Sequence, residues 1–179
     1  MTLGDAKKKL REYFEEACSI LEIDFQKIHF SYENIGEKFR TPSNTCETGE
    51  NILHINEDWI ISILKENFLY DLRYQMYHEA RHFYQRLAIV DPLYRVRFRE
   101  SNENIQLWGF EFSHYYRNEG TVETQRNNAA QFVEVDAKAF AIVLLSKHNL
   151  PARCPEDQRQ QTEQRANEIY RSLIRMGKT

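Results

Sequence analysis

The stretch LYDLRYQMYHEARHFYQRLAIVDP, residues 69–92, decides the fold because a helical apolar pattern runs through it. The helical pattern begins at Glu57, with an interruption near Asn67. It ends at Asp91-Pro92, because proline disfavours helical backbone at the residue before it. The apolar residues recur every three or four positions, so we expect them to form one stripe that lies in the core: Leu69, Leu72, Met76, Ala80, Phe83, Leu87 and Val90.

The residues before this helix predict another helix and a small sheet. Residues 3–21 have apolar positions at helical spacing, and Asp5 stands where an acidic residue suits a helix start. β-Branched and aromatic residues favour strands at 23–25, 28–32 and 51–56. We expect two or three strands to form an antiparallel sheet that packs on a helix, because an isolated hairpin is marginal in water.

The residues after Pro92 predict mainly helices. Residues 94–99 alternate like a strand, whereas residues 104–116 favour a helix rich in aromatic side chains. Residues 121–150 predict a helix whose second half is apolar nearly all round, as in a helix buried between neighbours. A last polar helix over 156–176 is typical of a solvated surface element. The expected fold class is therefore α+β and mostly helical, with a small antiparallel sheet packed on the central helix.

Length and composition indicate one domain over residues 1–179. The net charge of -3 lacks the basic excess of a nucleic-acid-binding protein, so Arg95, Arg97 and Arg99 are interpreted as a solvated strand face. No apolar run approaches the roughly 20 residues of a membrane span, and the N-terminus lacks the apolar core of a signal peptide. The three cysteines are widely separated, which argues against a cysteine zinc site. We expect a cytoplasmic protein with no membrane partner and no nucleic-acid partner.

Two histidines and a glutamate in the sequence His78-Glu79-Ala80-Arg81-His82 indicate a metal site. Histidines four residues apart on a helix project from the same face, so both imidazoles can bind one ion. At about 100° per residue, this face points away from the apolar stripe. Such a motif is typical of zinc, with the glutamate as the general base that takes a proton from water. The alternative is two structural histidines with an incidental glutamate.

A catalytic zinc ion needs a third protein ligand and an open position for water. Gln85 and Ala88 stand where the metzincin pattern requires a glycine and a third histidine, so the ligand must come from farther along the chain. Glu134 and Asp136 lie inside the apolar segment 132–145, where an unpaired carboxylate is costly. Two residues apart on a helix, they point in nearly opposite directions and cannot both reach one ion.

Glu134 is the favoured third ligand, because its helical face carries small residues that allow a close approach to the histidine helix: Ala130, Ala137 and Ala141. Asp136 then holds a ligand histidine or caps a polar group, and it remains the alternative ligand. Glu119 and Glu123 are further candidates in a polar stretch, where a solvated glutamate is the simpler interpretation. The residues thus predict a site for one zinc ion.

This set of residues resembles the gluzincin metallopeptidases, and more specifically their small intracellular members, the minigluzincins and ImmA/IrrE-like proteins. The resemblance covers the strand at 52–56, the motif at 78–82 and the segment EVDAKAFA at 134–141, which is similar to the family's E-x-(E/D)-A-x-x-F-A helix. Lys138 departs from the Asn or Asp usual at its position. The segment between residues 90 and 120 is also longer than in the shortest members.

The resemblance implies a zincin-like fold and a zinc-dependent peptidase that acts on a peptide or protein substrate. Carried over onto this sequence, it makes His78, His82 and Glu134 the ligands of one Zn²⁺ ion and Glu79 the base. It also implies that strand 52–56, as a sheet edge beside the cleft, pairs with an extended peptide by strand addition.

Four other residues are assigned roles around this site. The developing oxyanion needs a hydrogen-bond donor, and His114, Tyr115 and Tyr116 are candidates, with packing as the alternative for such an aromatic run. Arg81 is interpreted as pairing with an acidic neighbour, in preference to binding a substrate carboxylate.

Three functions fit these residues. The first is a zinc-dependent peptidase that hydrolyses peptide bonds with zinc-activated water and Glu79 as general base. The second is a non-catalytic binding or regulatory module on a zincin scaffold, and the third is another hydrolase with the same water-activating site. Glu79 favours an enzyme, because a purely structural metal site has no need of a base between its histidines.

Overall fold

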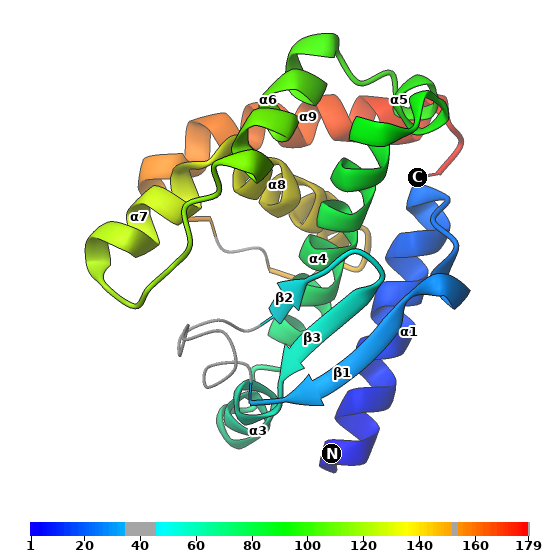
Figure 1. The fold of residues 1–179 in the computed structure, drawn as a ribbon. Coiled ribbons are helices and arrows are strands. Elements are labelled where there is room, and N and C mark those ends of the chain that lie inside the picture. The colour runs from blue at the N-terminus through cyan, green and yellow to red at the C-terminus, as the bar shows by residue number, and fades with distance from the viewer. Residues whose placement is uncertain (35–45, 152–153, 179) are drawn as a thin grey trace.

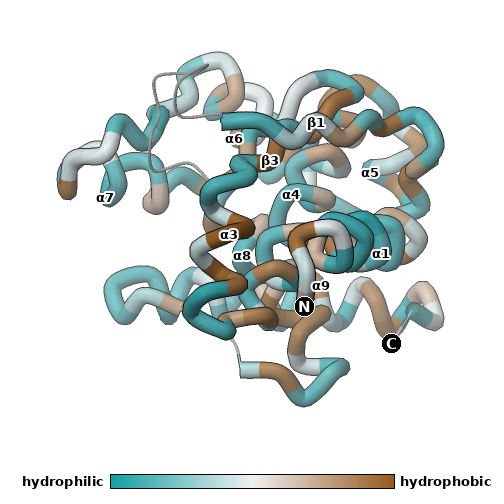
Figure 2. The backbone as a smooth tube through the Cα atoms, turned by 90° about the horizontal axis from the view of Figure 1, so that it is seen from below, coloured by the Kyte–Doolittle hydropathy of each residue, from teal (hydrophilic) through white to brown (hydrophobic). Residues whose placement is uncertain are grey.

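The computed structural model describes residues 1–34, 46–151 and 154–178, whose arrangement is shown in Figure 1. The first helix, α1 (Leu3–Leu21), has the bounds that the sequence predicts. A capping box starts it: the Thr2 hydroxyl accepts from the Asp5 N–H, and the Asp5 carboxylate accepts from the Thr2 N–H. Figure 2 shows α1 mostly in the hydrophilic colour, while its apolar residues form a buried face.

The sheet follows α1 and contains β1 (His29–Glu33), β2 (Cys46–Thr48) and β3 (Ile52–Asn56) in the order β1-β3-β2. β2 and β3 are antiparallel, but β1 and β3 are parallel, so the prediction of an antiparallel sheet is wrong for β1. The segment 34–51 is longer than the dozen residues that a parallel connection needs. The mixed order makes β3 the central strand, which contradicts the expectation that it forms the edge beside the cleft.

The strand predicted at 23–25 is also wrong. A short 3-10 helix, η1 (Phe25–Lys27), takes its place, because the Asp24 carboxylate accepts from the Gln26 N–H and turns the chain. The strand predicted at 28–32 is present as β1. It packs on α1 through Phe14, whose ring lies 5.3 Å from that of Phe30.

The central helix is α4 (Leu69–Val90), which follows α3 (Glu57–Glu66). The break near Asn67 is confirmed: Asn67 ends α3 with a left-handed backbone conformation, φ 58°. The predicted stripe is buried along the middle of α4, at Leu72, Met76, Ala80 and Phe83. It reaches solvent at the two ends of the helix, because Leu69 and Val90 are 38% and 74% exposed.

The segment after α4 is helical, so the strand predicted at 94–99 is wrong. Pro92 opens α5 (Pro92–Phe98), and the Asp91 carboxylate caps it by accepting from the Leu93 N–H. Arg95 and Arg97 therefore lie on a helix, which Arg99 ends in a left-handed conformation, and Arg95 donates to the carbonyls at the end of α4. The next helix, α6 (Asn102–Ser113), confirms the helical prediction for this region.

The long helix predicted at 121–150 is divided into α7 (Val122–Ala130) and α8 (Phe132–Lys147), because Gln131 between them has an extended backbone. α8 packs against α4 on one side and against α9 (Arg159–Arg175) on the other, after a short 3-10 turn, η2 (Glu156–Gln158). Figure 1 shows α8 crossing behind α4, on the side away from the sheet. Within the described ranges, no helix combines the length and apolar character needed to cross a membrane.

Candidate metal centre

Three side chains from two helices converge between α4 and α8. His78 and His82 lie one turn apart on α4, and their Nε2 atoms are 2.9 Å apart. Glu134, in the first turn of α8, places one carboxylate oxygen 3.2 Å from His78 Nε2 and the other 3.3 Å from His82 Nε2. All three residues are buried. The cluster can therefore hold a metal ion, as the sequence predicted for these residues.

The spacing of the donor atoms fits a small tetrahedral ion. Ligand bonds of about 2.0–2.2 Å to such an ion separate its ligand atoms by roughly 3.3 Å. The two imidazole nitrogens are 2.9 Å apart, and each lies near this distance, at 3.2 and 3.3 Å, from a different oxygen of the Glu134 carboxylate. Within the described residues the cluster offers three protein donors, one fewer than the four of a closed structural zinc site.

The charges of the cluster also favour a cation. Burial alone would lower the pKa of His82, but the adjacent Glu134 carboxylate raises it to about 9. Burial would raise the pKa of Glu134, but His82 and His78 hold it well below its usual range. A positive charge between these groups is thus strongly stabilised, and a metal ion supplies that charge in place of a proton.

Gln85 fixes the orientation of His82. Its side-chain carbonyl accepts from His82 Nδ1 at 2.8 Å, which leaves the lone pair of Nε2 facing the cluster. The side-chain amide of Gln85 donates to the Val133 carbonyl at 3.0 Å and to the Asp136 carboxylate at 2.6 Å. His78 differs, because its Nδ1 is buried without a hydrogen-bond partner among the described residues. The hydrogen bonds of Gln85 therefore tie the imidazole of His82 to α8, whereas His78 has no such contact at its Nδ1 in the described part of the chain.

Asp136 lies behind Gln85, away from the three clustered donor atoms. It is fully buried and accepts hydrogen bonds from Arg81, at 2.8 and 3.1 Å, and from Arg165 of α9, at 2.6 Å. Both arginines also pair with Glu100 at 2.6 Å. Asp136 thus supports His82 through Gln85, and Arg81 pairs with acidic neighbours as its sequence context indicated.

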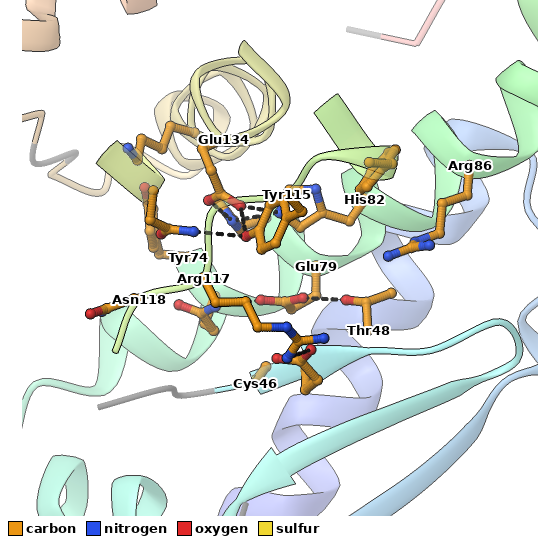
Figure 3. Close-up of a pocket in the computed structure, with 16 residues that line it drawn as sticks. Cys46, Thr48, Tyr74, Glu79, His82, Arg86, Tyr115, Arg117, Asn118 and Glu134 are labelled. Atoms are coloured by element: carbon orange, nitrogen blue, oxygen red, sulfur yellow. Dashed lines mark hydrogen bonds and ion pairs between the residues drawn. The ribbon is translucent and has the colours of Figure 1, made fainter. Parts of the chain in front are cut away.

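Glu79 faces the same space as the cluster, as Figure 3 shows. Its side chain is held by the Thr48 hydroxyl, from β2, and by the Gln75 amide, one helical turn earlier on α4. The contact with Thr48 joins the sheet to the centre of α4. Neither Thr48 nor Gln75 carries a sequence signal for this role, because the first depends on strand register and the second on the rotamer of Glu79.

A cavity of about 330 Å³ opens over the cluster. Its walls come from β2, α4, the end of α6, the segment that follows α6, α7 and α8. The strand that lines it is β2, in place of the expected β3. The lining side chains include His78, Glu79, His82, Arg86, Phe112, Tyr115, Arg117, Glu134 and Lys138.

No family model, no curated protein and no solved structure matches this chain.

Of the three predicted oxyanion donors, only Tyr115 lines the cavity. Its hydroxyl donates to Glu134 and accepts from Asn128 at 3.0 Å. Burial of the hydroxyl and the neighbouring Glu134 carboxylate raise the pKa of Tyr115 well above its usual range, so it remains a proton donor. His114 stacks on Phe110 with ring centroids 4.5 Å apart, and Tyr116 is 63% exposed.

Glu119, Glu123 and Lys138 lie outside the metal cluster. Glu119 lies in the segment before α7, and Glu123 lies in the first turn of α7. Both are exposed, which agrees with the interpretation as solvated glutamates. Lys138 lines the cavity, where burial lowers its pKa. Its amine donates to the Ala129 carbonyl and to the Gln158 side chain, so it links α8 to the turn before α9.

Proposed function

We propose that this chain is a zinc-dependent peptidase whose zinc ion is bound by His78, His82 and Glu134. The observation that carries the proposal is the convergence of His78, His82 and Glu134 at the wall of a cavity that Glu79 also lines. Two imidazoles and a carboxylate form a donor set that zinc prefers. When bound there, zinc supplies a Lewis acid that activates water and polarises a carbonyl group.

Glu79 is the proposed general base. Its carboxylate borders the cavity, and Thr48 and Gln75 hold its oxygens, so its direction is fixed before a substrate binds. In that position Glu79 takes the proton from the attacking water and delivers it to the leaving amine.

Tyr115 is the proposed donor to the oxyanion that develops on the scissile carbonyl. Its hydroxyl donates to Glu134 in this structure, which places it next to the metal ligands. A small rotation would redirect the hydroxyl to a carbonyl oxygen in the cavity. Such donors act strongly where water is excluded.

The experiment compares the zinc-loaded wild type with Glu79→Gln on a peptide library prepared from a proteome digest. We expect new peptide termini with the wild type and none with Glu79→Gln, although both proteins bind zinc, because the amide of the variant cannot accept the proton. Tyr116→Phe is the matched control, since Tyr116 lies outside the cavity lining, and it should cleave like the wild type. If the wild type and Glu79→Gln give the same termini, the chain is a binding module and not a peptidase.

A further inference from the structure

Arg86 stands on the same face of α4 as the two ligand histidines. Positions 78, 82 and 86 are successive steps of four residues, so their side chains follow one another along the helix. Arg86 lines the metal-site cavity, and Figure 3 shows its side chain extending toward the part of the cavity where Thr48 lies. Its Cα is about 6 Å farther along the helix axis than that of His82.

The guanidinium of Arg86 stacks on the ring of Phe112, with Cζ 4.3 Å from the ring centroid. Stacking on an aromatic face holds the planar group in one orientation and leaves its N–H edge free to donate. Within the part of the chain that the structure describes, Arg86 makes no hydrogen bond and no ion pair. An orientated guanidinium with free donors is a binding group for a carboxylate.

The other charged groups of this cavity already have partners. Arg117 pairs with Glu47 at 2.7 Å, and Lys138 donates to Gln158 at 2.7 Å. Glu79 is held by Thr48 and Gln75, as described above, and the Glu134 carboxylate lies against the two histidines. Arg86 is thus a cation at the cavity wall that has no hydrogen-bond or ion-pair partner among the described residues.

Space around Arg86 is sufficient for such a ligand. Arg86 and Phe112 also line a second cavity, of about 670 Å³, so Arg86 borders open volume in two cavities. A rise of about 6 Å from His82 corresponds to about two residues of an extended peptide. A carboxylate on Arg86 would thus belong to a residue close to the scissile bond.

We propose that Arg86 binds a substrate carboxylate located within about two residues of the scissile bond, so that the preferred substrates carry an acidic side chain or a free C-terminus there. This inference rests on the proposed peptidase function, because it assumes that the metal ion binds the scissile carbonyl. It concerns substrate selection only, and Arg86 takes no part in the proton transfers.

The test uses binding, so that it does not depend on turnover. The probes are carboxyalkyl hydroxamates with two to six methylene groups between the hydroxamate, which chelates zinc, and the carboxylate. Each is matched by the carboxamide of the same length. At the best length, we expect the zinc-loaded wild type to bind the carboxylate at least about tenfold more tightly than the carboxamide, the factor of a charged hydrogen bond. Arg86→Gln should remove this preference, and Arg86→Lys should keep part of it.

Arg126→Gln is the control for net charge, because Arg126 is exposed on α7 and lies outside both cavities. It should keep the full preference for the carboxylate. If hydroxamates bind the wild type but carboxylate and carboxamide are equal at every length, the role of Arg86 is wrong and the metal site stands. If no hydroxamate binds the zinc-treated wild type, the proposed metal site itself is wrong. The peptide library then distinguishes an acidic side chain from a free C-terminus. Amidation of the peptide C-termini abolishes the preference if Arg86 binds a terminal carboxylate and leaves it unchanged if Arg86 binds an acidic side chain.

Discussion

Replacing Asp136 with asparagine should destabilise the protein strongly. Asp136 accepts four hydrogen bonds: two from Arg81, one from Arg165 and one from Gln85. In the wild type, the two arginines are balanced by two buried carboxylates, Asp136 and Glu100. The Asp136→Asn variant leaves two buried guanidinium groups facing one buried carboxylate, and the new amide group turns a donor toward them.

The expected loss follows from the cost of an uncompensated buried charge. Removing one partner of a buried ion pair destabilises proteins by about 3–5 kcal/mol. For a chain of this size, that corresponds to a Tm lower by roughly 6–20 °C. The matched control is Glu168→Gln, which removes another carboxylate from Arg165, but one whose side chain is 48% exposed. Its expected loss is below about 1 kcal/mol.

Urea unfolding followed by circular dichroism measures both variants, with a chelator present so that metal binding does not contribute. A loss below about 1 kcal/mol for Asp136→Asn would refute the reasoning that the buried Asp136 carboxylate compensates the charges of Arg81 and Arg165.

The stability difference between the wild type and Asp136→Asn should also depend on pH. Burial would raise the pKa of Asp136, but Arg81 and Arg165 hold it below its ordinary value of 3.8. A carboxylate with a lowered pKa in the folded state stabilises the protein above its unfolded pKa, and this contribution is lost as the pH falls through the folded-state value. The stability difference between the wild type and Asp136→Asn should therefore be full at neutral pH and shrink in acid below about pH 4.

Three further predictions concern the metal centre. Gln85→Leu removes the acceptor for His82 Nδ1, so zinc affinity in competition with a chromogenic chelator should fall about 10- to 100-fold; unchanged affinity would show that Gln85 does not orient the ligand. Tyr115→Phe should lower kcat about 100-fold or more with little change in KM, as expected for a lost oxyanion donor, whereas a change in KM alone would assign Tyr115 to substrate binding. Chelator should lower the Tm of the wild type but not that of His82→Ala, because a ligand that binds only the folded state stabilises it.

Local sequence patterns were sufficient to predict α4 and its motif. The apolar spacing from Leu72 to Phe83 marks the buried face, and the four-residue separation of the histidines fixes their common side. Glu134 was also predictable, because a carboxylate within an apolar helix needs a compensating partner. Each of these inferences depends on residues close together in the chain.

The strand predicted at 94–99 and the edge position predicted for β3 are wrong because helix capping and strand pairing do not appear in the alternation of apolar and polar residues. Residues 94–99 alternate like a strand, but Asp91 and Pro92 start a helix there, and capping decided the structure. The central place of β3 depends on a pairing between β1 and β3 that no local pattern encodes. The hydrogen bond of Gln85 to α8 and the stacking of Arg86 on Phe112 join residues far apart in the chain, so no local pattern predicts them.

The metal centre is tested most directly by titrating zinc into the chelator-treated wild type and Glu134→Gln, with bound metal measured after gel filtration. We expect one zinc ion per wild-type chain and much weaker binding by Glu134→Gln, which keeps both histidines but lacks the third charged ligand. Substoichiometric zinc in the wild type, or equal binding by the two proteins, would contradict a site formed by His78, His82 and Glu134.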